Sequence, residues 1–379
     1  MSDRTFDLLL KQDATGKTLD VKVEQELPEP KPLTVIELKP DTKETYLSSL
    51  TEGSVVDWGD GTESTITAAE AQAKHVKHTY ADTSTDNRVV TIDGVIDRTK
   101  YYLMNDATFD KNALTAVRSL GKLIGSAGAL FRNCKSLTTI PAGLFEHCTE
   151  LTDFNECFDG CSSLTEIPSG LFDHCTEVVD FNYCFQDCPG LTEIPAGLFD
   201  HCTKVTIMAA CFAGCSSLTA IPAGLFDHCQ AVTTFSLCFA GCSSLTAIPA
   251  GLFDHCPAVT RFANCFASCS NLTAIPAGLF DHCTEVTSML ACFHECSSLT
   301  AIPTGLFDHC TKVVEFYCCF QGCSNLTGET PYTMVDGKKV KLWDRSPENG
   351  FANATEKSLM CFASCTGLSD YAEIPADWG

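Results

Sequence analysis

Adjacent histidine and cysteine residues are the side chains of this chain best suited to chemistry. Seven such pairs recur at 27-residue intervals, from His147-Cys148 to His309-Cys310. A cysteine nucleophile activated by histidine needs both side chains and a third, orienting group in one pocket. Neighbouring residues of an extended segment point in different directions, and an enzyme needs its catalytic pair once. The pattern therefore predicts a structural role, no catalytic residues and no enzyme activity.

Two kinds of metal site are the next alternatives. Each repeat holds one histidine and three cysteines, but the C-x8-C-x3-C spacing lacks the compact C-x2-C knuckle of structural zinc sites. Asp57 and Asp60 could ligate calcium, although two acids on one turn supply few oxygens and Asp side chains commonly stabilise turns. The sequence therefore predicts no metal site and no cofactor.

The 25 cysteines all lie at or after Cys134, and 21 of them form three columns across the repeats. Cysteine is a small, soft hydrophobic residue that suits the narrow interior of a coil. Equivalent residues of neighbouring coils would lie about 5 Å apart, within disulfide range. The odd total and the expected cytoplasmic start nevertheless favour buried, reduced thiols.

Composition excludes some partners. The formal charge of −23, from 48 acidic and 25 basic residues, argues against nucleic acids and anionic membranes, which attract basic surfaces. The residues after Met1 show no basic-then-apolar leader, and no apolar run is long enough to span a bilayer. We therefore expect a chain that begins folding in a cytoplasm.

A period of 27 residues dominates the chain from about residue 101 onward. The dipeptide Ile-Pro recurs seven times between Ile140 and Ile302, and the full repeat is clearest from Leu218 to Ser244. Such a period marks a stacked array in which each repeat packs on its neighbours. Apolar spacing is doubled within each repeat, which predicts two half-turns of 14 and 13 residues, each a short strand followed by a tight helical turn. The fold class is therefore mainly β with short helical turns.

Three regions follow from the composition. Residues 1–32 are expected to form a β-hairpin and a proline-rich linker that anchor the chain to a larger assembly or to other copies of itself. Residues 33–97 are expected to form a small β-sandwich. Residues 98–379 form the repeat array, whose last coil carries an insertion, about residues 328–345, with the pattern of a hairpin.

Two segments resemble known families. The string V-V-D-W-G-D-G-T at residues 55–62, followed by His78-Thr-Tyr80, resembles the PKD-type immunoglobulin-like domain, which implies a β-sandwich used as a spacer or binding module. The repeats share F-x-G-C-S-S-L-T-x-[IL] with the leucine-rich repeats of BspA-like bacterial surface proteins, over roughly Leu114 to Pro375. That resemblance implies a right-handed solenoid of stacked parallel strands that serves adhesion or recognition.

One face of the predicted array is diversified. In the strand V-T-x-F-x, the residues on either side of the inward aromatic residue differ from repeat to repeat, whereas the strand L-T-x-I-P has a single free position with only Thr, Glu or Ala. Neutral drift on an exposed strip is the alternative to a binding surface. The candidate ligand-binding residues are Asp180, Asn182, Ile207, Thr234, Ser236, Arg261, Ser288, Leu290, Glu315 and Tyr317.

These features predict a non-enzymatic recognition or decoration protein. Surface-type modules without a leader favour a phage virion component, head- or tail-attached and fibre-like, that is held through residues 1–32. Its array would bind a protein or glycan of a cell surface, and association between copies of the chain stays open. A bacterial cell-surface adhesin is the alternative, and the binding subunit of an enzyme ranks third.

Overall fold

The computed structural model describes residues 31–73, 75–81, 84–99, 108–353 and 359–379. Residues 1–31 and Pro32–Gly379 are separate units. The expected hairpin and anchor at residues 1–32 therefore fall, apart from the last two residues, outside the described residues. No helix in the described ranges is long and apolar enough to cross a membrane.

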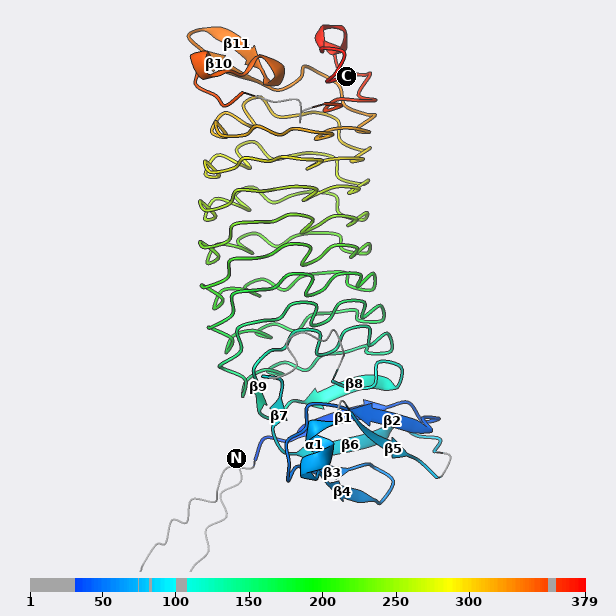
Figure 1. Ribbon diagram of the computed structural model, residues 1–379. Helices are drawn as coiled ribbons and strands as arrows, with labels where there is room; N and C mark the ends of the chain where they lie inside the picture. Colours follow the sequence, from blue (N-terminus) through cyan, green and yellow to red (C-terminus); the bar gives the residue numbers. More distant parts are fainter. Residues whose placement is uncertain (1–30, 74, 82–83, 100–107, 354–358) are drawn as a thin grey trace, which may run out of the picture. The chain divides into compact units, whose positions relative to one another are not determined.

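The N-terminal module is built around a five-stranded antiparallel sheet. Its strands are ordered β4-β3-β6-β1-β8 (Figure 1). The bounds are β1 Thr34–Leu38, β3 Val55–Asp57, β4 Glu63–Thr65, β6 Arg88–Asp93 and β8 Leu114–Ser119. Because β8 belongs to the first coil and pairs with β1, the sheet continues across the domain boundary expected at residue 97.

Short elements complete this module. Two two-stranded sheets pair β2 with β5 and β7 with β9, and the short helix α1 begins at a capping box between Thr67 and Glu70. The bounds are β2 Glu44–Leu47, α1 Ala68–Gln72, β5 Val76–Thr79, β7 Ile96–Asp97 and β9 Leu123–Ile124. Short strands are thus present across residues 33–97, together with the helix α1. The PKD-type sandwich stays a prediction.

The W-G-D-G-T segment is a turn held by its own acids. Asp57 Oδ1 accepts a hydrogen bond from Gly59 N at 2.9 Å, and Asp60 Oδ1 accepts from Thr62 N at 3.0 Å. Asp60 Oδ2 lies 2.9 Å from Nε2 of His78, whose ring stacks on that of the buried Trp58. Turn stabilisation thus accounts for both carboxylates.

The repeats form coils that stack directly on one another (Figure 1). Each expected strand V-T-x-F-x is reduced to a single parallel bridge, such as Asp180 to Ile207 and Ile207 to Thr234. Backbone bonds then run from each coil to the next: Phe185 N donates to Cys211 O at 2.8 Å and Asp187 N to Ala213 O at 2.7 Å. Turns occupy most of the rest of each coil. The chain is mostly β in character, with very few helices in its described part.

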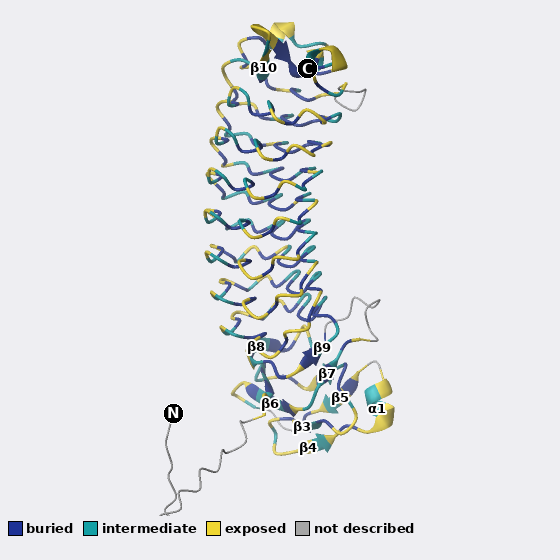
Figure 2. Cartoon of the chain, turned by 90° about the vertical axis from the view of Figure 1, so that its left-hand side faces the viewer, coloured by how far each residue is buried: buried dark blue, intermediate teal, exposed yellow. Residues whose placement is uncertain are grey.

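Columns of identical side chains fill the interior. Buried residues recur along every coil (Figure 2). Phe185 stacks on Phe158 and Phe212 with ring centroids 5.2 and 5.7 Å apart, and the same contact repeats through the array. Aromatic stacks of this kind add to the burial of apolar area. The inward register predicted from the repeat is therefore confirmed.

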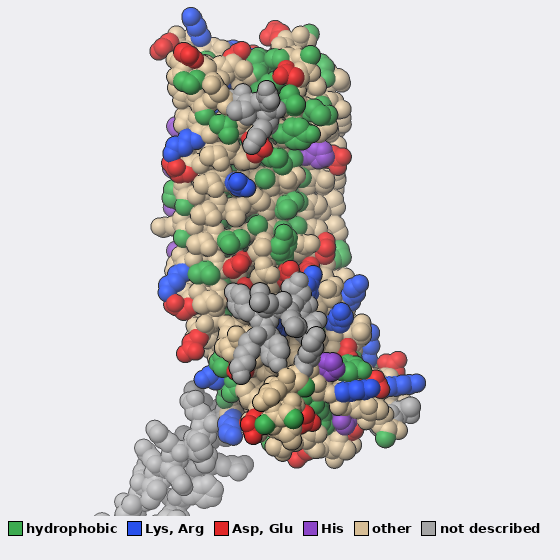
Figure 3. Space-filling model, viewed as in Figure 1, with side chains coloured by type: hydrophobic (Ala, Val, Ile, Leu, Met, Phe, Trp, Pro, Cys, Tyr) green, Lys and Arg blue, Asp and Glu red, His purple; other side chains and the backbone are tan. Residues whose placement is uncertain are grey.

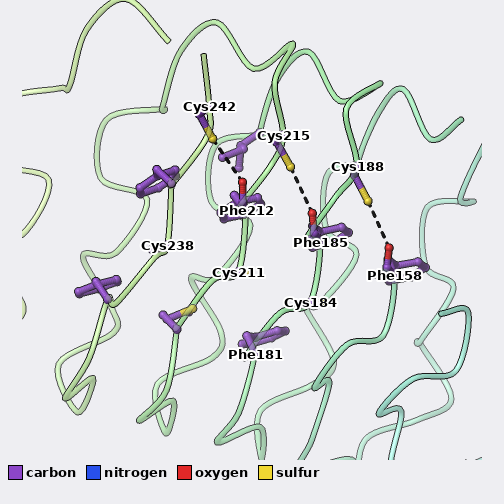
Figure 4. Close-up of a cluster of buried hydrophobic side chains, with 14 of the residues drawn as sticks. Phe158, Phe181, Cys184, Phe185, Cys188, Cys211, Phe212, Cys215, Cys238 and Cys242 are labelled. Carbon is purple, nitrogen blue, oxygen red and sulfur yellow. Dashed lines mark hydrogen bonds between the residues drawn. The ribbon is translucent and has the colours of Figure 1, made fainter. Parts of the chain in front are cut away.

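One cysteine column also bonds the coils together. The thiols of Cys188, Cys215 and Cys242 lie 3.2–3.3 Å from the carbonyl oxygens of phenylalanines 30 residues earlier (Figure 4). Each thiol thereby satisfies a buried carbonyl of the preceding coil. All 25 cysteines are buried and free.

The insertion forms a cap at the end of the array. Strands β10 (Tyr332–Val335) and β11 (Lys338–Lys341) pair as the expected hairpin, followed by the 3-10 helices η1 (Leu342–Asp344) and η2 (Pro347–Asn349). The coil then resumes, because Phe362 stacks on Phe320 at 5.7 Å. Another 3-10 helix, η4 (Tyr371–Glu373), precedes the C-terminus.

Candidate recognition surface

The candidate surface is a strip made of three columns of residues, here called the variable strip. Its first column contains the bridge residues, and its second contains the residues two positions later. Its third column, directly after the second, is held in a left-handed backbone conformation, with φ between 50° and 62°. This left-handed column consists of Ala129, Glu156, Tyr183, Ala210, Leu237, Asn264, Ala291, Cys318 and Met360.

Several side chains of the bridge column form hydrogen bonds within their own coil. Asp180 Oδ1 accepts from Asn182 N at 2.7 Å, and Thr234 Oγ1 accepts from Ser236 N at 3.1 Å. Burial raises the pKa of Asp180, with the nearby Asp153 carboxylate adding to the shift and the bond from Asn182 opposing it. Several polar residues predicted to bind ligand therefore use their side chains to hold the turn beneath them.

Other predicted residues bond to each other between coils. Ser288 is buried and donates from Oγ to Glu315 Oε2 at 2.6 Å. The side-chain oxygen of Asn182 is buried without a hydrogen-bond partner among the described residues. The polar half of the predicted set is therefore less available to a ligand than its sequence positions indicate.

The apolar and basic residues of the strip face solvent. Tyr317 is 39% exposed, Arg261 is exposed, and Ile207 and Leu290 are half-buried. Hydrophobic side chains gather along the coils on the face seen in Figure 3. The large hydrophobic residues that the described structure exposes are Val179, Leu237, Tyr317, Met334, Leu359 and Met360. All except Met334 lie in the strip or, for Val179, directly before it.

The left-handed column was not recognised from the sequence. A side chain at positive φ costs about 1–2 kcal/mol, which glycine avoids. Another left-handed position of the coil, in the segment I-P-x-G, is glycine in all seven repeats, from Gly143 to Gly305. The left-handed column of the strip contains no glycine, and it places Leu237 38% exposed at φ 62°. The residue types of this column gave no signal in the sequence, because most of them rarely adopt positive φ.

The histidine–cysteine pairs do not form a site. His174 is exposed whereas Cys175 is fully buried, and the other regular repeats place their pairs in the same way. Burial raises the pKa of Cys175 to about 12, so its reactive thiolate is scarce near neutral pH. Within the described ranges, no group of three or more His, Cys, Asp or Glu side chains is arranged to hold a metal ion.

The repeats identify the family. The family described as BspA type leucine-rich repeat region, in six copies, matches residues 105–330, which is more than half of the chain. The chain belongs to the BspA-type leucine-rich repeat family. Among curated proteins, none matches this member of the family.

Two solved structures are similar to this BspA-type chain. A leucine-rich cell surface protein of Faecalibacterium prausnitzii A2-165 is 18% identical, with a TM-score of 0.21 over 73% of this chain and 83% of that chain. The TLR13–ssRNA13 complex is 10% identical, with a TM-score of 0.16 over 66% of this chain and 46% of that chain. At these TM-scores neither similarity bears on function.

Proposed function

We propose that this protein is a non-enzymatic recognition protein that binds its partner through the variable strip. The observation that carries the proposal is the left-handed column, where Leu237 and Tyr183 occupy positions at which glycine would fold with less strain. The fold imposes the left-handed backbone but does not require a side chain there, and strained backbone positions of this kind cluster at functional surfaces. The exposed hydrophobic residues along the same strip are typical of an interaction site.

We place this protein at a bacterial cell surface. Membership of the BspA-type family supports the alternative derived from the sequence, a surface adhesin, better than attachment to a virion. The N-terminal module then acts as a PKD-type spacer below the array. Its support is the buried Trp58 in the W-G-D-G-T turn, with Tyr80 Oη donating to the Trp58 carbonyl at 3.2 Å.

A non-enzymatic role is consistent with the state of the thiols. The repeated cysteines are buried, and burial raises the pKa of Cys215 and Cys229 to about 12. Their role is to fill the interior and bond adjacent coils, as Cys215 does with Phe185. The seven exposed histidines next to the first cysteine column thus have buried thiols as their sequence neighbours.

Binding is tested with two matched double variants on arrays of immobilised proteins and glycans. Leu237→Asp with Leu290→Asp changes the strip, and Ala220→Asp with Ala274→Asp adds the same charge at exposed positions of the uniform L-T-x-I-P strand. We expect the strip variant to lose at least tenfold in affinity for every array feature that the wild type binds, and the control to keep it. Equal affinities of the two variants would contradict the proposal.

Location is tested separately with antibodies on intact cells of the organism that makes the protein. We expect labelling without permeabilisation. Labelling only after permeabilisation, or recovery of the protein with sedimented phage particles, would contradict the cell-surface assignment while leaving the binding test unaffected.

A further inference from the structure

The variable strip is not uniform along the array. Three of its four acidic residues, Asp153, Glu156 and Asp180, lie in the coils nearest the N-terminal module, where Arg132 pairs with Glu156 at 2.9 Å and Asp153 accepts from Ser126 at 2.6 Å. The fourth, Glu315, lies in a later coil and accepts from Ser288 at 2.6 Å. Further along, the strip carries large apolar side chains that are exposed or half-buried, among them Leu237, Leu290 and Tyr317. We therefore expect the centre of the binding surface in the later coils.

Arg261 is the distinctive charge of that later part. Residues 137–326 contain three cations, Lys204, Arg261 and Lys312. The two lysines each pair with a glutamate one coil earlier, at 2.6 and 2.5 Å. Arg261 is exposed, and no carboxylate in the described part of the chain pairs with it. On a chain with a net charge of −23, an exposed arginine that no carboxylate of the described residues pairs is unlike its surroundings.

Leucines of the two adjacent coils flank this arginine. Leu237 N donates to Ala263 O at 2.8 Å, and Asn264 N donates to Leu290 O at 2.7 Å. The segment that carries Arg261 thus lies between the segments that carry Leu237 and Leu290. Ala263, two residues after Arg261, has only a methyl group, and Arg261 itself is exposed.

We propose that Arg261 is the charged anchor of a protein–protein interface centred on Leu237, Leu290 and Tyr317, and that the partner presents a carboxylate surrounded by apolar side chains. This inference rests on the proposed binding role of the strip. Covering the leucines removes water from the guanidinium, which then needs an anionic partner. A carboxylate matches the planar donors of arginine with two parallel hydrogen bonds.

The surrounding residues favour a protein partner over a glycan. The centres of protein interfaces are enriched in arginine, tyrosine and methionine and poor in lysine, aspartate and glutamate. The later part of the strip carries Arg261, Tyr317 and Met360, and its exposed leucines match apolar side chains. Its one carboxylate among the described residues, Glu315, accepts a hydrogen bond from Ser288.

The test selects peptides from a random displayed library on the immobilised full-length protein. The baits are the wild type, Arg261→Glu and Lys135→Glu, which reverses an exposed charge of the array outside the strip. We expect the wild type and Lys135→Glu to enrich sequences with Asp or Glu between apolar residues, and Arg261→Glu to enrich Lys or Arg instead. A synthetic peptide of the wild-type consensus should bind Arg261→Glu at least tenfold more weakly.

The other outcomes separate this inference from the proposed function. Peptides that bind Arg261→Glu as tightly as wild type, but not the Leu237→Asp, Leu290→Asp variant, would overturn the anchor and leave the strip as the binding face. Arginine-dependent binding to sulfated or sialylated oligosaccharides, with no acidic peptide consensus, would overturn the protein partner. Peptides that bind all variants equally would overturn the binding role of the strip itself.

Discussion

Phe235 and Leu237 lie two positions apart and have different roles within the coil. Phe235 is fully buried, and its ring centroid lies 4.6 Å from that of Phe226 and 4.9 Å from that of Phe253. Leu237 is partly exposed at positive φ. The Phe235 side chain packs adjacent coils together. The Leu237 side chain contributes little to the stability of the fold beyond what glycine would contribute at that position.

This contrast predicts unequal effects on stability. Phe235→Ala should lower the free energy of unfolding by about 3–5 kcal/mol, because it leaves a cavity in the aromatic column. Leu237→Gly should change it by less than about 1 kcal/mol, because relief of the left-handed strain opposes the lost contacts and the greater freedom of the unfolded chain. Urea unfolding followed by circular dichroism measures both. Equal losses would show that Leu237 is a core residue.

The cysteines give a second prediction at this scale. Because burial raises the pKa of Cys134 and Cys269 to about 12, we expect iodoacetamide to label few thiols of the native protein at pH 8. In denaturant without reductant it should label all 25 cysteines, as counted by mass spectrometry. Thiols that react only after reduction would show disulfides between coils.

Inward and outward residues were not equally predictable. Phe181 and Cys184 could be assigned to the interior because the same residue types recur at a fixed spacing, and only burial requires that. The left-handed conformation of Tyr183 could not be predicted, because it is imposed by hydrogen bonds to the next coil, such as Tyr183 N to Ala209 O at 2.9 Å. Residue type alone predicts such a conformation for glycine or asparagine, and not for tyrosine.

At the scale of elements, the W-G-D-G-T turn links stability to pH. Burial opposes ionisation of Asp60, but hydrogen bonds from Thr62 and the contact with His78 outweigh it and lower the pKa to about 2, from 3.8. A lowered pKa stabilises the fold above the unfolded value, and this contribution is lost as the pH falls through the folded value.

We therefore expect the N-terminal module to lose stability between about pH 4 and pH 2, and Asp60→Asn to weaken that dependence. Thermal unfolding followed by Trp fluorescence at a series of pH values measures it, since Trp58 packs on His78. The control is Asp336→Asn, which removes an exposed carboxylate from the turn between β10 and β11. A pH dependence that Asp60→Asn leaves unchanged would contradict the assignment.

The cap at the end of the array depends on one buried ionic contact. Lys341 Nζ lies 2.5 Å from Asp370 Oδ2 and 2.9 Å from Glu329 Oε1, and Asp370 also accepts from Thr330 N at 3.0 Å. Asp370→Asn should cost about 1–3 kcal/mol, because it weakens a charged hydrogen bond in a buried place. Hydrogen exchange should show faster exchange confined to β10, β11 and the last coil. Faster exchange throughout the array would mean that the cap controls the whole stack.

Elements were predictable where short-range signals are strong. The β10–β11 hairpin has Asp336-Gly337 between two strand-like segments, a typical two-residue turn. The capping box of Thr67 and Glu70 was visible in the sequence as well, but a helix of five residues has no periodicity to support it. Strand β8 joins the N-terminal sheet by pairing with β1. The two strands are far apart in the sequence, so no local pattern predicts their pairing.

At the scale of the whole molecule, each coil bonds to the coils before and after it. Deletion of residues 192–218, one complete period, should therefore leave a folded protein whose remaining coils stack in register. Deletion of residues 192–204, about half a period, should prevent folding, because it brings unlike half-turns together. Size-exclusion chromatography and urea unfolding distinguish the two. If the 27-residue deletion also aggregated, the coils would not be interchangeable.

The array could be predicted from the sequence as a whole, because a 27-residue period that recurs without slippage is typical of stacked repeats, and the BspA-type match agrees with it. The partner could not. The proposed binding residues differ from repeat to repeat and follow no period, so the periodicity that predicts the fold does not point to them. Solvent exposure distinguishes Arg261 from its column neighbours Thr234 and Ser288, and the lack of an ion pair within the described part of the chain distinguishes it from Lys204 and Lys312.

The bridges also fix the spacing between outward residues of successive coils. Parallel strands lie about 4.8 Å apart, so each period places the outward residues one strand spacing further along the stack. The interiors of the coils are nearly identical, whereas the outward residues differ, as Ile207, Thr234 and Arg261 do. Unequal recombination between the repeated segments of the gene would insert or remove complete coils without disturbing the packing of the interior. The same fold would then present Arg261 at a new distance from the apolar residues of other coils. Binding specificity could therefore change through the number of repeats, without point mutations.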